Sequence, residues 1–396
     1  MTARPRQAGR ITVQRGTPAT PPRGTRPRNR RQLIITAAAD LFASDGYAQV
    51  SMADIAAAVA VRPSALYRHV HGKNDLLYQV IDGTLSAMQA GVHGLASARE
   101  LAVTALNHRR LGVLWQRESR HLPPAARERL RTRLTGIAAQ VAAFIAQCRP
   151  DLHATESDLL AWSCLEAATS ISFQRIILPR PEYTDLLAGI IDRIIGTDLH
   201  SPSAVATAPP PDTDLDRRDE LLTAAARLFA ERGYHSVGID DVGTAVGIAG
   251  PSIYHHFTTK LDLIVAIMNR GADQLVHATA HTLADARDDT EALDALLRAY
   301  TSFSLTHSHV MDVLITEIPH LPEPHRTELR QIQRRYLGQW LHILARLHPG
   351  PPPAHIRVHL QAALTVINDI ARTPQLLTRP PGAAAVTAIG HAILDP

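Results

Sequence analysis

The chain contains two copies of one sequence. Residues 30–77 align with residues 217–264 without a gap, and 20 of the 48 positions are identical. The C-terminal parts also align, with residues 118–123 falling on residues 317–322, but the offset grows from 187 to 199 residues. The second copy therefore carries twelve extra residues between about positions 78 and 112 of the first. Such a repeat predicts two units of one fold rather than several unrelated domains.

Both copies show helical periodicity. In the first copy, apolar residues at 33, 34, 37, 38, 41 and 42 have helical spacing, and Gly46 follows as a C-terminal cap. Ser51 and Asp54 have the Ser-x-x-acid spacing that begins a helix. We expect first-copy helices at 29–45, from Ser51 through Val59, at 64–70, from Lys73 onward, and at 99–119, 125–148, 155–178 and 183–196. In the second copy we expect 216–232, 239–246, 251–257, 260–282, 291–307, 323–347, 353–373 and 382–394.

The predicted architecture is all-α, with two tandem units that each have a three-helix head and a larger helical domain. A proline-rich segment without apolar periodicity separates the units and is predicted to be an extended linker. The predicted ranges are a disordered basic arm at 1–28, heads at 29–78 and 216–265, helical domains at 79–196 and 266–396, and the linker at 197–215.

The positive charge is concentrated at the N-terminus. The whole chain has a formal net charge of +4, but residues 1–31 contain nine arginines and no acidic residue. Two cysteines are too few for a disulfide framework or a cysteine-based zinc site. No apolar run approaches the roughly 20 residues of a membrane span, and the N-terminus lacks the apolar core of a secretory signal. These features predict a soluble cytoplasmic protein.

The order of the head helices predicts a helix-turn-helix, and the residues around it resemble the TetR family of bacterial transcriptional regulators. The first copy shows Leu-Phe at 41–42, Gly-Tyr at 46–47, Ile-Ala-Ala-Ala-Val-Ala-Val at 55–61 and Leu-Tyr-Arg-His-Val at 66–70, followed by Lys73 and Leu76. The second copy shows the same spacing at 228–229, 233–234, 242–248 and 253–257, followed by Lys260 and Leu263. Ala60 stands where the family's turn glycine is usual, and Arg62 and Ala249 stand where the recognition helix usually opens with Ser or Thr.

The resemblance implies which residues meet DNA. Tyr, Ser and His donors can hold phosphates, and Arg68 is the candidate for reading guanine in the major groove. Because His255 replaces Arg68 in the second copy, the two half-sites are expected to differ. For Tyr67 and Tyr254 the alternative is packing in the head, whereas Leu66 and Ile253 are assigned to the core. The implied contacts are Ser51, Arg62, Pro63, Ser64, Ala65, Tyr67, Arg68 and His69, and in the second copy Ala249, Gly250, Pro251, Ser252, Tyr254, His255 and His256.

The lysines of the chain occupy equivalent positions in the two copies. The chain has only two, Lys73 and Lys260, and both stand at the start of the fourth helix of their copy. A helix N-terminus with an ammonium group is suited to a DNA phosphate. Inheritance by duplication without a function is the alternative. Basic residues that open the first helices could add backbone contacts or form only a solvated face: Arg30, Arg31, Arg217 and Arg218.

The resemblance also implies that the C-terminal halves hold a ligand pocket and a dimer interface, and that a mostly apolar small molecule releases DNA. The last two helices of both copies are expected to form a four-helix bundle, which would make the chain a covalent pseudo-dimer. Pairing of two chains with four heads is the alternative. Pocket candidates, each alternatively plain core, are Leu114, Trp115, Phe144, Trp162, Tyr300, Phe303, Met311 and Trp340, with Glu118 and Glu317 as polar lining or local caps.

The expected function is therefore sequence-specific DNA binding by a transcriptional regulator, most simply a repressor. The alternative is a non-specific architectural DNA-binding protein driven by the basic arm. No nucleophile motif or phosphate-binding glycine loop is present, so no enzyme and no cofactor are expected. The pairs His355/His359 and His277/His281 have metal-ligand spacing but no evident third ligand, so they are interpreted as surface histidines and no metal is expected.

Overall fold

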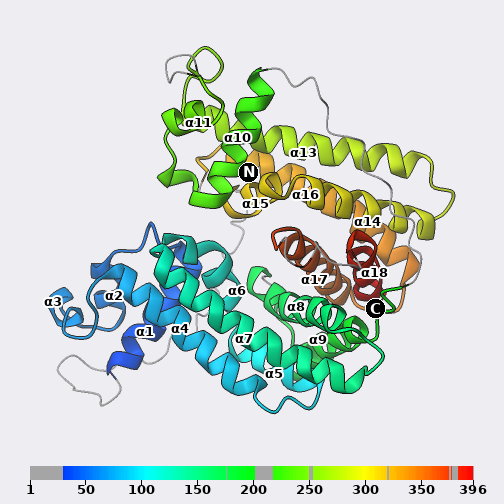
Figure 1. The fold of residues 1–396 in the computed structure, drawn as a ribbon, viewed down its shortest axis with the longest axis horizontal. Coiled ribbons are helices and arrows are strands. Elements are labelled where there is room, and N and C mark those ends of the chain that lie inside the picture. Colours follow the sequence, from blue (N-terminus) through cyan, green and yellow to red (C-terminus); the bar gives the residue numbers. More distant parts are fainter. Residues whose placement is uncertain are drawn as a thin grey trace, which may run out of the picture. The chain divides into compact units, whose positions relative to one another are not determined.

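A computed structural model describes residues 30–174, 176–200, 217–248, 253–318, 321–373, 376 and 382–395. Every regular element in these ranges is a helix, which confirms the all-α prediction (Figure 1). The predicted arm at 1–28 and most of the predicted linker lie outside the described residues. The chain divides into two compact units, one ending at Val80 and the other beginning at Ile81. None of the described helices is long and apolar enough to cross a membrane.

The first unit contains the first head. Its helices are α1 (Arg30–Asp45), α2 (Met52–Ala58), α3 (Pro63–Leu66) and the beginning of α4 (Lys73–Val92). Residues four positions apart on α1, namely Ile34, Ala38 and Phe42, are buried on one face of the helix. The predicted helix at 64–70 is shorter in the structure. The amides of His69 and Val70 both donate to the carbonyl of Leu66, which closes the helix there.

The second head belongs to the second unit, together with both larger helical domains. It is built from α10 (Arg217–Arg232), α11 (Ile239–Ala245) and the start of α13 (Lys260–Ala284). The helix predicted at 251–257 falls partly outside the described residues. Phe229, Val242 and Ile253 form one core with Val313 and Leu329, so the second head is packed onto its own regulatory half.

The larger domains follow the predicted order with different boundaries. In the first copy they contain α5 (Ala98–Asn107), α6 (Leu111–Val113), a π-helical turn (Leu114–Glu118), a 3₁₀ turn (Ser119–His121), α7 (Pro124–Cys148), α8 (Ala154–Ser170) and α9 (Arg180–Ile195). In the second copy they contain α14 (Asp289–Thr306), α15 (Ser308–Thr316), α16 (His325–Leu347), α17 (Pro353–Ala371) and α18 (Gly382–Leu394). Helix α15 was not expected from the sequence.

Two of the predicted long helices are interrupted. The helix expected at 99–119 breaks at His108. Its counterpart His307 has nearly the same φ (−120° against −118°) and ends α14 where the second-copy helix was predicted to end. The helix expected at 155–178 ends at Ser170 because the Arg109 guanidinium holds the chain that follows. It donates to the carbonyls of Ile171 (3.1 Å), Gln174 (2.9 Å) and Ile176 (3.0 Å). Those carbonyls therefore need no helical partners.

The twelve extra residues of the second copy lengthen one helical hairpin. Helix α13 has 25 residues where α4 has 20, and α14 has 18 where α5 has 10. The connection between α13 and α14 is one residue shorter than the connection between α4 and α5. The insertion is therefore helical throughout and lies in the region that the change of offset indicates.

The last two helices of each copy form one four-helix bundle. Helix α17 packs against both α8 and α18, and α9 packs against α8 and α18 (Figure 1). A polar contact across the copies joins His355 Nε2 to Glu182 Oε1 at 2.7 Å. The faces of the two copies that this bundle buries are covered within a single chain.

Candidate DNA-binding heads and ligand cavities

The helix-turn-helix corners of the two heads have the same geometry. In the first, the Ser51 hydroxyl accepts from the Asp54 amide (3.1 Å), while the Ser51 amide donates to the Asp54 carboxylate (2.8 Å). The turn after α2 has Ala60 at φ 54°, and the turn after α11 has Gly247 at φ 72°. The next amide in each copy returns to the carbonyl five residues earlier at 2.9 Å. Both corners are therefore Schellman-type helix ends.

The residues on and after the recognition helix divide into core and surface. Leu66 and Ile253 are fully buried, which confirms their assignment to the core. Tyr67 and Tyr254 are 57% and 55% exposed, so neither side chain is committed to head packing. Ala65 is half-buried, and the other described candidates are exposed: Arg62, Pro63, Ser64, Arg68, His69, His255 and His256. Ala249, Gly250, Pro251 and Ser252 lie outside the described residues.

Both lysines lie over a tyrosine ring. Lys73 Nζ is 4.1 Å from the centroid of Tyr47, and Lys260 Nζ is 4.3 Å from the centroid of Tyr234. Each tyrosine in turn packs against a phenylalanine in the last turn of the first helix of its head, Phe42 or Phe229. Burial lowers the pKa of Lys260, and the nearby Glu317 and Asp241 carboxylates oppose that shift. The aromatic contact fixes the ammonium group at the N-terminus of a long helix in both copies.

The arginines that open the first helices have protein contacts of their own. Arg31 donates to the Gln79 side chain at 2.9 Å, Arg217 pairs with Glu220 at 2.6 Å, and Arg218 lies 5.0 Å from the ring of Phe257. Arg30 is half-buried. Such exposed pairs are weak, so they compete little with a phosphate.

A cavity of about 410 Å³ lies between α13, α14, α15, α16 and α17 of the second copy, and first-copy residues complete its lining. Tyr300 and Met311 line it, as does Tyr336. The remaining second-copy candidates do not. Trp340 is fully buried beside Tyr300, with ring centroids 6.0 Å apart, and Phe303 stacks on His307 at 4.6 Å. Bulky apolar side chains at these positions fill the core instead of facing the cavity.

The corresponding region of the first copy is closed. A remnant of about 10 Å³ remains between Met88, Leu111 and Trp115, which is at most the space of one water molecule. Trp115 also lines a second cavity of about 620 Å³ together with Trp162, and residues of both copies surround this cavity. Leu114 is fully buried and Phe144 is half-buried on α7, and neither lines a described cavity.

Sequence comparisons agree with this geometry. The profile of bacterial regulatory proteins of the TetR family matches residues 34–80 and again residues 221–267, and that of the tetracyclin repressor-like C-terminal domain matches residues 286–372. The HTH-type transcriptional activator FasR of Mycolicibacterium smegmatis is 35% identical over 109 residues, which are 28% of this chain and 49% of FasR. The HTH-type transcriptional repressor KstR2 of Rhodococcus jostii is 31% identical over 194 residues, which are 47% of this chain and 94% of KstR2. The chain belongs to the TetR family.

This TetR-family chain spans about half the length of FasR and nearly the whole length of KstR2. Among solved structures, a TetR-family regulator from Bordetella parapertussis is 21% identical, with 45% of this chain and 94% of that chain covered and a TM-score of 0.41. Family membership makes the chain a DNA-binding regulator, and the family profile matches once in each copy.

A buried ion pair joins the two copies of this TetR-family chain beside the second head. Arg120, from the first copy, binds Glu317, and their side chains are only 11% and 1% exposed. The same Glu317 carboxylate accepts from the amide of Tyr234 at 3.4 Å. Glu118, its counterpart in the first copy, is also buried, and neither glutamate lines a described cavity. Sequence reasoning missed Arg120 because its partner is 197 residues away.

The histidine pair on α17 is part of the bundle. His359 is 2% exposed, so its interpretation as a surface histidine was wrong. Its Nδ1 is 2.5 Å from the carbonyl of Ile393 on α18. Burial lowers the pKa of His359 to about 4. Within the described residues, no group of three metal-ligating side chains is present.

Proposed function

We propose that the chain is a ligand-responsive transcriptional repressor in which a single chain supplies both DNA-binding heads. The four-helix bundle of α8, α9, α17 and α18 carries this proposal. In the family these C-terminal helices form the dimer interface, and here they are paired within one chain. A covalent pseudo-dimer needs no second copy to present two heads.

The repressor assignment follows the relative that matches over most of its length. KstR2, covered over 94% of its length, is a repressor, whereas FasR, covered over 49%, is an activator. A repressor that acts by occupying its operator needs only to bind that DNA and to be released from it. Release follows if the ligand and the operator favour different states of the molecule.

The two heads are expected to read different half-sites. Arg68 is suited to a two-donor contact with guanine, whereas the imidazole of His255 at the equivalent position lacks the paired donors for that contact. Selection of bound duplexes from a random library by the full chain should enrich an asymmetric site. Arg68→Ala should relax the preference in one half of that site, and His255→Ala should relax it in the other half.

Two outcomes of this selection would count against the proposal. If no sequence is enriched, or if both substitutions relax the same half-site, the two-headed sequence-specific function is contradicted. Deletion of residues 1–28 should weaken binding to the selected site without changing its sequence. Complete loss of binding on that deletion would favour the architectural alternative.

A further inference from the structure

The second-copy cavity is built by both copies. Its walls are mostly apolar side chains of α13 to α16, but part of its lining is polar. Its polar lining includes Asn368, Asp369 and Arg372 on α17 together with Gln116 and Arg117 from the first copy. A ligand in this cavity would therefore touch residues from both halves of the duplication.

The two first-copy residues reach the cavity from a π-helical turn. Leu114–Glu118 forms this turn, whereas the second copy has regular α-helix in α15. A π turn inserts one residue into the helical repeat and so redirects the side chains around it, and such turns are common at functional sites. Gln116 uses this placement to donate to Glu166 at 3.2 Å and to Asp369 of the other copy.

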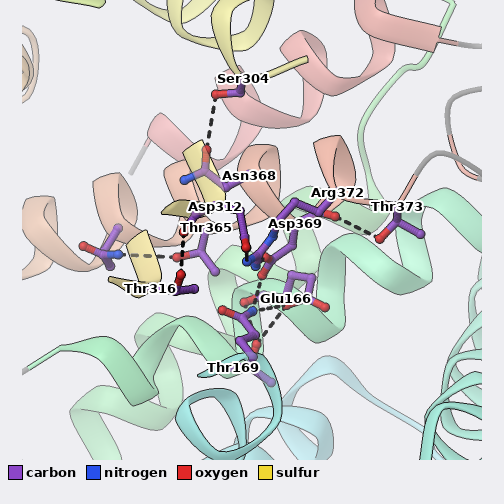
Figure 2. A network of polar contacts seen from close by, with 12 residues as sticks. Glu166, Thr169, Ser304, Asp312, Thr316, Thr365, Asn368, Asp369, Arg372 and Thr373 are labelled. Atoms are coloured by element: carbon purple, nitrogen blue, oxygen red, sulfur yellow. Dashed lines mark hydrogen bonds and ion pairs between the residues drawn. The ribbon is translucent and has the colours of Figure 1, made fainter. Parts of the chain in front are cut away.

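Most of the polar lining has hydrogen-bond or ion-pair partners within the protein. Arg372 binds both Asp312 and Asp369, so its charge is balanced by two carboxylates (Figure 2). The Asn368 side chain oxygen accepts from Tyr300 at 3.0 Å and from Ser304 at 3.2 Å. The charge of Arg372 is therefore already balanced by carboxylates of the protein, and Asn368 carries no charge that could bind an anion.

Arg117 is the exception. Its Nε–H is buried and has no hydrogen-bond partner among the described residues. Burial lowers the pKa of its guanidinium, and the neighbouring charges of Arg120 and Arg330 add to that shift, against the opposing effect of Glu118 and Glu317. A guanidinium stays charged in proteins, so the unmet donor is a free-energy cost that an incoming anion would relieve.

We propose that the chain binds one small molecule with an apolar body and a single carboxylate, whose carboxylate binds Arg117 while its body fills the second-copy cavity. The proposal rests on the proposed regulatory function and names the ligand class of that site. A planar carboxylate matches the paired donors of a guanidinium. A dianion such as a phosphate monoester would need more uncompensated positive charge than this one arginine supplies.

The counterpart of this cavity in the first copy is closed, so we expect one such site in each chain. Its remnant of about 10 Å³ cannot hold such a molecule, whereas about 410 Å³ lies in the usual range of small-molecule sites. The two copies therefore contribute differently to this site. The second copy forms most of the cavity wall, and the first copy supplies Arg117, whose charge would bind the carboxylate.

Calorimetric titration of the full chain tests the proposal. The probes are straight-chain acids from octanoate to dodecanoate and 4-biphenylcarboxylate, each compared with its primary alcohol. At least one acid should bind at one molecule per chain and roughly tenfold or more tighter than its alcohol. Arg117→Gln should remove this preference, Arg117→Lys should retain part of it, and Arg335→Gln, at an exposed position of α16, should leave it unchanged.

Four calorimetric results would contradict this ligand assignment. Equal binding of acid and alcohol, a preference that survives Arg117→Gln, two acids bound per chain, or no binding by any acid would each overturn the proposal. Operator binding by the ligand-free wild-type chain is measured separately. If that binding is present while the acid results are contrary, only the ligand assignment fails and the proposed regulator remains.

Discussion

Ala60 and Gly247 occupy the same left-handed turn with different residues. The φ of Ala60 is 54°, a conformation that costs a residue with a Cβ roughly 1–2 kcal/mol. Gly247 adopts φ 72° without that cost. The first head therefore stores strain at a position where the second head does not.

Exchanging these residues should change the stability of each head in opposite directions. Ala60→Gly should stabilise the first corner by about 0.5–1 kcal/mol, because relief of strain exceeds the added entropy of the unfolded chain. Gly247→Ala should destabilise the second corner by about 1 kcal/mol or more. Hydrogen exchange of the α2 and α11 amides measures both. Faster exchange in α2 after Ala60→Gly would contradict the strain argument.

Removal of either lysine should weaken binding to all DNA sequences alike. Lys73→Ala and Lys260→Ala should each reduce the slope of log affinity against log salt by about 1, because each removes one phosphate contact. Lys73→Arg should retain most of the slope. Titrations of the selected site and a scrambled duplex at several salt concentrations provide the test. An unchanged slope would support inheritance by duplication without a DNA contact.

At the residue scale, the sequence predicted the heads well because their signals are local. Helical spacing and capping residues identified the corner, and the core assignments of Leu66 and Ile253 were confirmed. The cavity was predicted poorly. Gln116 and Arg117 reach it only through a π-helical turn and a packing partner from the other copy, and neither feature leaves a periodic signal.

At the element scale, the Arg120–Glu317 pair links the first-copy segment after α6 to the second head. Arg120→Met should cost about 3 kcal/mol or more, because it leaves Glu317 buried without its partner. The double variant Arg120→Met/Glu317→Gln should lose clearly less than the sum of the two single variants. Denaturant unfolding of all four proteins measures this coupling.

The exposed pair Arg99–Asp185 is the matched control for that cycle. Its side chains are 58% and 60% exposed, so its coupling should stay below about 1 kcal/mol. Equal coupling energies for the two pairs would show that burial does not strengthen the contact between the copies.

His359 should make the bundle sensitive to acid. Its pKa is about 4 in the folded chain because of burial, with Arg193, His355 and His348 adding to the shift and the Ile393 carbonyl opposing it. The unfolded state therefore binds the proton more readily, and stability falls as the pH drops below about 6.5. Between pH 7.5 and pH 5 the loss should be about 2 kcal/mol from this group.

Thermal unfolding across this pH range measures the effect. His359→Gln cannot titrate but keeps a donor for Ile393, so it should flatten the dependence, whereas the same change at the exposed His277 should not. A pH dependence that is identical in wild type and His359→Gln would contradict the assignment.

Helix ends were the least predictable part of the fold. Local signals placed the start of α2 correctly, at the Ser51 cap. The end of α8 depends on three carbonyls bound by Arg109, which is more than 60 residues away in the sequence. Tertiary hydrogen bonds of this kind override the local preference of residues 171–178, and no window of sequence around α8 contains them.

At the scale of the whole molecule, duplication turns what would be contacts between two chains into contacts within one. The bundle, the Arg120–Glu317 pair and the composite cavity each join residues of the two copies. Fusion into one chain also allows the two copies to differ from each other. The closed first-copy counterpart of the cavity and the different recognition residues, Arg68 and His255, are examples. A symmetric homodimer would be held to two identical heads and two identical pockets.

Mass measurement of the protein bound to its selected operator tests this account most directly. A chain of 43.1 kDa that supplies both heads should bind as one chain per operator, and the free protein should be monomeric at the same concentration. Native mass spectrometry resolves these states. Two chains per operator, with a free dimer, would contradict the pseudo-dimer and favour an assembly with four heads.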